Sequence, residues 1–374
     1  MIKVWDYLDE YKELRTEILD TVDEVFQSGT LVFGSKLDKF ENEFTSFIST
    51  KYGLGVGNGT DALYIALKAV GVENGDEVIT TSNTAVPTVT AIVNAGAKAK
   101  FVDINDYYLI DEKLIENKIT KKTKVIMPVH LYGQVCNMEL INKIAKKHNL
   151  YVIEDCAQSH GSKANNKQSG SFGDIGCFSF YPTKLLGGYG DGGFITTNNK
   201  DLYEKMMRIR FLGMERKKMS SGHWNGKYYA VEHGTNSRLD EVHAAILSVK
   251  LKYLDKWIEK RRKIAKIYES ELNNLSIDIP KEAKNNFHAY YIYVVSHPKR
   301  DEILKKLSEK DIHLNISYPW PIHIMEPYKE FVCDNCDCLP ITEQKAKSIF
   351  SLPMYPYLSE EKQLKTISEL KKII

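Results

Sequence analysis

Short apolar segments alternate with amphipathic segments from residue 76 onward, and this rhythm constrains the fold more than any other feature. The pattern predicts helices over residues 86–95 and 138–148, between predicted strands at residues 77–80, 99–104, 124–129 and 151–154. Strands that alternate with helices are typical of a mostly parallel sheet with helices on both faces. We therefore expect an α/β fold.

The length of 374 residues leaves room for two or three domains. Short connections predict one large α/β domain over residues 1–235, which begins with helices at residues 1–30 and 36–49. We expect residues 236–374 to form a long linking helix, through about residue 272, and a small α+β domain. That domain has a predicted strand at residues 290–296 and predicted helices at residues 300–311 and near Thr342 and Ser359.

The charge balance argues against a nucleic-acid or membrane partner. Fifty-one basic and 49 acidic residues leave a formal charge of +2, so no global field attracts a polyanion. The N-terminal segment is amphipathic and lacks the apolar core of a signal peptide. No window approaches the roughly 18 apolar residues of a membrane span. We expect a cytoplasmic protein.

Three cysteines, Cys333, Cys336 and Cys338, form a cluster that includes the C-x-x-C spacing of zinc ligands. No second cysteine pair or histidine pair follows them. We therefore expect a reduced surface loop rather than a metal site, and its role stays open.

Two carboxylates and one lysine occupy positions that suit a cofactor site. Glu154 and Asp155 end a predicted strand, which is where open α/β sheets place their ligands. Lys184 follows the strand-like residues 177–180 and precedes the glycine-rich residues 187–193. Pyridoxal phosphate (PLP) needs an amine that holds its aldehyde as an imine, and an anion at its ring nitrogen. Lys184 could supply the amine and Asp155 the anion.

A glycine-rich segment at residues 57–61 leads into a helical run and forms a candidate anion site. The free N–H groups of a first helical turn attract phosphate. An ordinary capped helix N-terminus that binds no ligand would have the same sequence. Residues 188–193 match G-x-G-x-x-G, but they precede a strand instead of opening a helix, so they do not indicate a dinucleotide site.

Six ordered motifs together carry a resemblance to a known family. They are GNGTDAL at residues 57–63, PVHLYGQ at 128–134, EDCAQ at 154–158, SFYPTK at 179–184, GDGG at 190–193 and NSRLD at 236–240. The chain resembles the sugar aminotransferases of the DegT/DnrJ/EryC1/StrS family, which have the aspartate-aminotransferase (fold type I) fold. The resemblance covers nearly the whole chain.

The resemblance implies PLP as the cofactor and a role for each matching residue. Lys184 would form the imine and act as the general base, Asp155 would face the ring nitrogen, and Gln158 would bind the ring O3′. The phosphate would be held by Gly59, Thr60 and Ser179, and by Asn236 of the neighbouring chain. The active unit would then be a homodimer with shared active sites.

One departure concerns the face of the cofactor ring. Many family members place a large aromatic residue in the segment that matches residues 83–87, where it stacks on the ring. This chain has Ala85 and Val86 there. The stacking residue is therefore left unassigned.

The resemblance also implies the substrates, L-glutamate and a nucleotide-linked keto sugar. Tyr181 and Pro182 before the lysine, Asp191 after it, and residues 86–89 resemble the branch that aminates C3 of the sugar. We therefore predict a dTDP-3-keto-6-deoxyhexose that becomes a dTDP-3-amino-3,6-dideoxyhexose. The alternative is a C4-aminotransferase that acts on an NDP-4-keto-6-deoxyhexose.

Two further alternatives are weaker. A PLP-dependent sugar dehydratase resembles this chain but has histidine in place of Lys184. A non-catalytic regulator with the same fold would not need Lys184, Asp155 and Gln158 intact.

Overall fold

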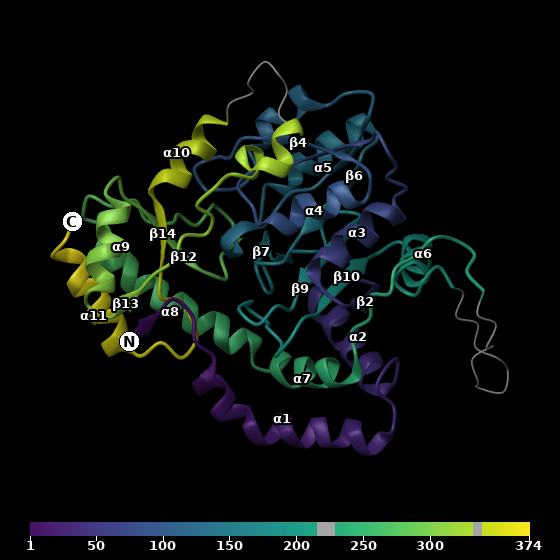
Figure 1. The fold of residues 1–374 in the computed structure, drawn as a ribbon, viewed down its shortest axis with the longest axis horizontal. Helices are drawn as coiled ribbons and strands as arrows, with labels where there is room; N and C mark the ends of the chain where they lie inside the picture. The colour runs from purple at the N-terminus through teal and green to yellow at the C-terminus, as the bar shows by residue number, and fades with distance from the viewer. Residues whose placement is uncertain (215–228, 332–338) are drawn as a thin grey trace.

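The computed structural model describes residues 1–214, 229–331 and 339–374 (Figure 1). The cluster Cys333, Cys336 and Cys338 lies outside these residues. Within the described ranges, no helix combines the length and the apolar character that crossing a membrane requires.

A seven-stranded sheet forms the centre of the larger part of the molecule. Its strand order is β2-β10-β9-β6-β5-β3-β4. All neighbours are parallel except β10, which runs antiparallel to both β2 and β9. The strands are β2 (Tyr52–Val56), β3 (Glu77–Thr81), β4 (Lys98–Val102), β5 (Thr123–Ile126), β6 (Tyr151–Asp155), β9 (Ile175–Ser179) and β10 (Gly193–Thr197). The predicted α/β architecture is confirmed.

Helices cover both faces of this sheet because successive strand residues point to opposite sides. Ile153 packs in one core cluster with residues of three helices, α3 (Gly59–Ala69), α4 (Val86–Asn94) and α6 (Lys200–Arg210). Its neighbour Val152 packs on the other face with α5 (Met138–His148). On that same face, Phe178 and Phe194 pack against α2 (Ser35–Ile48).

The C-terminal part has its own core around a two-stranded antiparallel sheet. The strand β12 (Tyr293–Ser296) pairs with β14 (Ile349–Leu352). The core beside it contains residues of α8 (Leu254–Leu272), α9 (Arg300–Ser308) and α11 (Glu360–Lys371). The helix α10 (Pro340–Ser348) leads directly into β14. Short 3-10 helices lie at Glu112–Leu114, Glu116–Lys118, Leu131–Gly133, Ile322–Ile324 and Glu326–Phe331.

Short strands connect distant parts of the chain. The strand β1 (Ile2–Lys3) pairs with β13 (Ile312–His313), so the first residues join the C-terminal part. The strand β11 (Asn286–Phe287) pairs with β7 (Lys163–Ala164), which also pairs with β8 (Lys167–Gln168). The division into domains at residues 235 and 236 stays a prediction.

Several predicted element boundaries are wrong, among them those of the first helix, of one strand in the C-terminal part and of the long linking helix. The first helix, α1 (Leu8–Ser28), begins at Leu8 because the preceding residues form β1. The predicted strand at residues 290–296 shortens to β12. The Arg261 guanidinium holds the carbonyls of Tyr290 and Tyr291, and Tyr290 has a φ of 48°. These carbonyls are therefore not available to a sheet ladder.

The predicted long helix over residues 240–272 is divided into α7 (Glu241–Leu251) and α8. Between the two helices the Tyr253 N–H donates to the Lys250 carbonyl at 3.0 Å. This bond spans three residues instead of the four of an α-helix, so the chain turns here. The helix α7 packs against α1 and α2, whereas α8 contacts α11 (Figure 1). The sequence has no glycine or proline at this turn, so the break was not visible in the residue pattern.

Candidate active site

A cavity of about 620 Å³ opens at the carboxyl ends of β6 and β9. Six of the predicted site residues line it together: Gly59, Thr60, Asp155, Gln158, Ser179 and Lys184. A second cavity of about 580 Å³ lies elsewhere, between Asn105 and Asn286, and none of the predicted residues line it. The first cavity is therefore the candidate active site.

One wall of the cavity is an anion-binding cup at the N-terminus of α3. Asn58 caps this helix, and its side chain accepts the Asp61 N–H at 2.8 Å. The first amides of the helix have no intrahelical partner and can donate to an anion. Gly59 lies so close to β9 that a Cβ on it would come 2.7 Å from the Ser179 Cβ. Glycine is therefore required at residue 59, and it brings the helix amides beside the Ser179 hydroxyl.

Asp155, the last residue of β6, provides a buried carboxylate beside the cavity. Its side chain is 4% exposed. One oxygen accepts the Ala157 N–H at 3.1 Å, and the other accepts the Thr88 hydroxyl at 2.8 Å. Burial raises the pKa of Asp155, while these two donors and the Lys184 ammonium act in the opposite direction. A cationic group placed at this carboxylate would gain a strong interaction because little water screens it.

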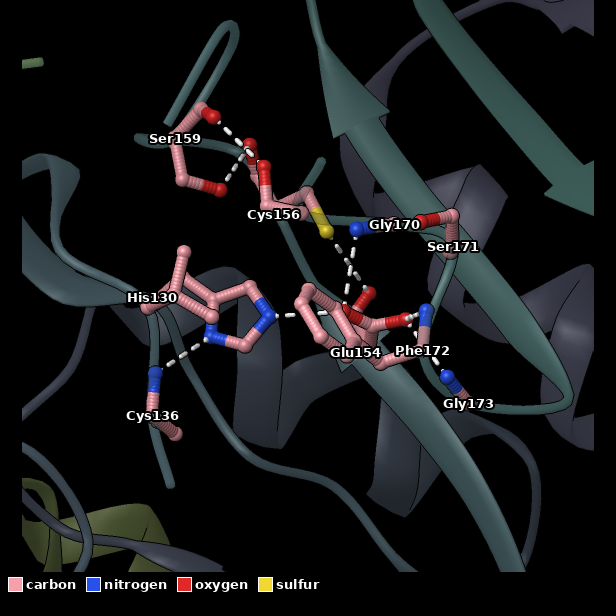
Figure 2. Close-up of polar contacts among 12 residues, drawn as sticks. His130, Cys136, Glu154, Cys156, Ser159, Gly170, Ser171, Phe172 and Gly173 are labelled. Atoms are coloured by element: carbon pink, nitrogen blue, oxygen red, sulfur yellow. Dashed lines mark hydrogen bonds and ion pairs between the residues drawn. The ribbon is translucent and has the colours of Figure 1, made fainter. Parts of the chain in front are cut away.

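Glu154 precedes Asp155 on β6 and therefore points to the opposite face of the strand. Its carboxylate is the centre of a hydrogen-bond network (Figure 2). One carboxylate oxygen accepts His130 Nε2 at 2.8 Å and Gly170 N at 2.9 Å. The other accepts the N–H groups of Phe172 and Gly173, both at 2.7 Å. His130 Nδ1 accepts the Cys136 N–H at 3.1 Å, so the ring proton lies on Nε2 and is donated to Glu154.

The side chains of His130, Glu154 and Cys156 lie close enough together to suggest a metal site, since their ligand atoms fall within 4.8 Å of one another. Four protein donors, however, already satisfy the Glu154 carboxylate, and the His130 nitrogen nearest to it carries a proton. The cluster is therefore a hydrogen-bonded anchor for residues 170–173, and it does not fit a metal.

Gln158 has a fixed amide orientation that leaves one donor free. Its Oε1 accepts the Tyr132 N–H at 2.8 Å, and its Nε2 donates to the Tyr318 hydroxyl at 2.8 Å. A glutamine amide has two N–H bonds, so one of them is still available for an acceptor in the cavity. Tyr318 comes from the C-terminal part, and the sequence analysis did not identify it.

Lys184 is held between polar and aromatic neighbours. Its Nζ lies 4.8 Å from the centre of the Tyr291 ring. The Tyr291 hydroxyl lies 3.0 Å from the Thr183 Oγ1, which fixes the ring beside the lysine. Tyr291 was also missed, and its only sequence signal is the tyrosine-rich run at residues 290–293.

Asn236 lies apart from the other predicted residues. It is exposed, is not among the residues that line the cavity, and forms a β-bridge with Phe211. The next residue, Ser237, is buried and connects to the anion cup. Its hydroxyl accepts the Gly57 N–H at 2.9 Å and donates to Asp61 at 2.6 Å.

The segment that the sequence analysis left without a stacking residue does line the cavity, through Thr84, Ala85, Pro87 and Thr88. Among the described residues that line the cavity, Tyr181 is the only aromatic one. Its side chain is 52% exposed, so it lies at the mouth and does not form a closed wall.

A lysine amine, a buried carboxylate and a helix N-terminus, gathered in one cavity of a mostly parallel sheet, define a PLP-dependent enzyme of the aminotransferase type. The residues present fit the cofactor, because each of its ionic groups would find a group of opposite charge or a hydrogen-bond donor in this cavity. Residues 12–371 match the DegT/DnrJ/EryC1/StrS aminotransferase family, and the chain belongs to this family. The predicted family is confirmed.

Several relatives are similar over nearly their full length. A dTDP-3-amino-3,4,6-trideoxy-alpha-D-glucose transaminase from Micromonospora megalomicea subsp. nigra is 44% identical to this chain. The match covers 99% of this chain and 98% of the relative. A pleiotropic regulatory protein from Geobacillus stearothermophilus is 43% identical, and the match covers 99% of this chain and 97% of the relative. A dTDP-3-amino-3,6-dideoxy-alpha-D-galactopyranose transaminase from Aneurinibacillus thermoaerophilus is 41% identical, with 96% of each chain covered.

The fold agrees with solved structures. The crystal structure of S. venezuelae DesV has a TM-score of 0.93 and 33% identity, with 100% of this chain and 98% of that chain covered. Aminotransferases of this family depend on PLP, so the chain is an aminotransferase and PLP is its cofactor. The predicted enzyme class and cofactor are confirmed.

Proposed function

We propose that the enzyme transfers an amino group from L-glutamate to a nucleotide-linked keto sugar. The observation that carries this proposal is the convergence of six predicted residues on one cavity. The transaminase names of two full-length relatives, both dTDP-amino sugar enzymes, support the substrate class.

Bound PLP supplies an aldehyde that carries the amino group and a ring that accepts electrons from the reacting carbon. The residues of the chain supply binding, orientation and proton transfer. The Gly59 and Thr60 amides and the Ser179 hydroxyl would bind the phosphate. Asp155 would hold the ring nitrogen in its protonated form, and the free N–H of Gln158 would donate to O3′. Lys184 would supply the amine that holds the aldehyde and the base that moves a proton during the transfer.

The active unit in this proposal is a homodimer in which Asn236 reaches the phosphate of the partner's cofactor. The exposure of Asn236, and its absence from the residues that line its own cavity, support this arrangement. The link from Ser237 to Asp61 places the exposed asparagine next to a segment that is already fixed.

For the sugar, we propose amination at C3 of a dTDP-3-keto-6-deoxyhexose, which gives a dTDP-3-amino-3,6-dideoxyhexose. Tyr181 and Asp191, which carry part of the sequence resemblance to the C3 branch, both line the cavity. The names of two full-length relatives also describe 3-amino sugars. The alternative, amination at C4 of an NDP-4-keto-6-deoxyhexose, uses the same cofactor residues.

The test supplies dTDP-4-keto-6-deoxyglucose and ¹⁵N-labelled L-glutamate, first alone and then with a 3,4-ketoisomerase. We expect product only with the isomerase, with nitrogen at C3 in the NMR spectrum. Product without the isomerase, with nitrogen at C4, would overturn the C3 assignment and favour the alternative. The variant Lys184→Ala, assayed in parallel, controls for contaminating activity.

A regulatory role is the second candidate, because one full-length relative is named a pleiotropic regulatory protein. The two functions make different predictions for glutamate alone. An aminotransferase releases 2-oxoglutarate in an amount equal to its active sites and shifts the absorbance of the bound cofactor. A non-catalytic regulator does neither, and that result would reject the proposed enzyme function.

A further inference from the structure

Two threonine hydroxyls form a chain of hydrogen bonds that ends at the Asp155 carboxylate. Thr88 is buried in the first turn of α4 and donates from Oγ1 to an Asp155 oxygen at 2.8 Å. Thr84 is also buried, and its Oγ1 lies 2.8 Å from the Thr88 Oγ1. All three residues line the candidate active site. The roles assigned above use neither threonine.

Hydrogen-bond chemistry fixes the direction of this chain. An ionised carboxylate can only accept, so the single hydroxyl proton of Thr88 goes to Asp155. The Thr88 oxygen can then accept the proton of Thr84. The two hydroxyls therefore point one after the other toward the carboxylate, and each polarises the next.

The segment that carries the two threonines is fixed at its start by the C-terminal part of the chain. Ser82 Oγ accepts the His323 N–H at 3.1 Å and is hydrogen-bonded to His323 Nδ1 at 2.7 Å. The Ile322 N–H donates to the Ser82 carbonyl at 3.1 Å. These groups are buried, so water does not compete for the hydrogen bonds that hold the start of this segment.

We propose that Thr88, supported by Thr84, is a positioning residue that holds the Asp155 carboxylate ionised and aimed at the ring nitrogen of PLP. This inference rests on the role of Asp155 in the proposed function. In this chain the segment at residues 84–88 brings no aromatic ring to the cofactor. Its contribution to the site is instead the pair of hydroxyls behind the carboxylate.

The experiment compares the affinity of the cofactor-free enzyme for PLP and for its carbocyclic analogue, in which C–H replaces the ring nitrogen. If a residue acts through Asp155 and the ring nitrogen, its substitution should lower the affinity for PLP but not the affinity for the analogue. We expect Thr88→Val to weaken PLP about tenfold, because a hydrogen bond to a charged group is lost. The same variant should change the affinity for the analogue by less than about twofold.

Three variants separate this role from packing. Thr88→Ser keeps the hydroxyl and should restore PLP affinity, whereas Thr84→Val should weaken it less than Thr88→Val. Thr90→Val is the matched control. It lies on the same helix, and its hydroxyl lies 3.0 Å from the Tyr328 hydroxyl, away from Asp155. It should leave both affinities unchanged.

The outcomes distinguish the inference from the proposed function. Equal weakening of both ligands by Thr88→Val would mean a packing defect and would overturn the inference. Unchanged PLP affinity in Thr88→Val would overturn it as well. If Asp155→Asn lowers neither PLP affinity nor turnover, the role of Asp155 itself fails, and the proposed function must be revised first.

Discussion

Lys184 is the residue on which transamination depends most directly. Lys184→Ala removes the only group at this position that can both bind the aldehyde and carry the proton. We expect turnover with glutamate and keto sugar to fall by on the order of a thousandfold or more. Lys184→Arg should be equally inactive because arginine stays protonated. Both variants should still bind PLP noncovalently, which equilibrium dialysis can measure. Full turnover in purified Lys184→Ala would refute the assignment.

Substitutions of the neighbouring carboxylates Asp155 and Glu154 should have different effects, the first on turnover and the second on folding stability. Asp155→Asn removes the charge at the ring nitrogen, so kcat should fall on the order of a hundredfold, with little change in folding stability. Glu154→Gln places N–H bonds against N–H donors in a fully buried network, so the free energy of unfolding should fall by about 3 kcal/mol. Urea unfolding and steady-state kinetics on both variants test this contrast. Two variants with the same pattern of defects would contradict it.

At the scale of elements, a carboxylate from one helix caps the start of another. The residue before α2 is Gly34, which has no side chain to cap the helix. Instead Glu241 of α7 accepts the N–H groups of Gly34, Lys36 and Leu37 at 2.8 to 3.1 Å. Glu241→Ala should therefore lower the free energy of unfolding by about 2 kcal/mol.

Thermal and urea unfolding measure the effect of Glu241→Ala. Asp38→Asn is the control, because Asp38 lies in the first turn of the same helix but is exposed. It should change stability by less than about 0.5 kcal/mol. An equal loss in both variants would show that the charge near α2 matters, and not the three hydrogen bonds from Glu241.

The sheet and the central site residues could be predicted because their signals are local. Asp155 and Lys184 each follow a short apolar run, and the carboxyl ends of parallel strands meet at one edge of a sheet. Thr88 and Tyr318 could not be predicted in this way. Thr88 is 67 residues from its partner Asp155 in the sequence, and Tyr318 is 160 residues from its partner Gln158. These contacts form only when the distant segments pack together. The same holds for the division between α7 and α8, because packing against different partners causes it.

At the scale of the whole molecule, buried neutral histidines should make the fold sensitive to acid. Burial, with a smaller effect of Lys184, lowers the pKa of His160 to about 3, and burial lowers the pKa of His288 to about 3. Between the unfolded pKa of 6.5 and about 3, the unfolded chain binds protons that the folded chain does not. Their contribution to stability is therefore complete above pH 6.5 and is lost as the pH falls through this window.

The variant His160→Phe tests this effect, because the His160 ring packs against the rings of Phe44, Phe178 and Phe180, and phenylalanine is an apolar ring that cannot titrate. Between pH 7 and pH 5, its free energy of unfolding should fall by about 2 kcal/mol less than that of the unmodified chain. Urea unfolding of the cofactor-free protein at both pH values gives this difference. An unchanged pH dependence in His160→Phe would disprove the explanation.

Mixing subunits tests the proposed shared active site. Asn236→Ala should weaken PLP retention, and at low PLP it should be nearly inactive, as Lys184→Ala is at any PLP concentration. If Asn236 serves the partner, a mixed dimer of the two variants carries both lesions in one site and leaves the other intact. We expect activity to return on mixing, up to about half that of the unmodified dimer for each mixed pair. No return after verified subunit exchange would place Asn236 in its own site.

The antiparallel strand β10 also has a consequence for the order in which the chain can fold. Among the described strands, β10 is the only neighbour of β2, so the strand that leads into the anion cup joins the sheet through residues 193–197. During synthesis, residues 52–56 must wait for a partner about 140 residues later in the chain, and such long-range pairing is slow. A nascent chain that stops before β10 should therefore bind no cofactor, even though it already contains the phosphate cup, Asp155 and Lys184.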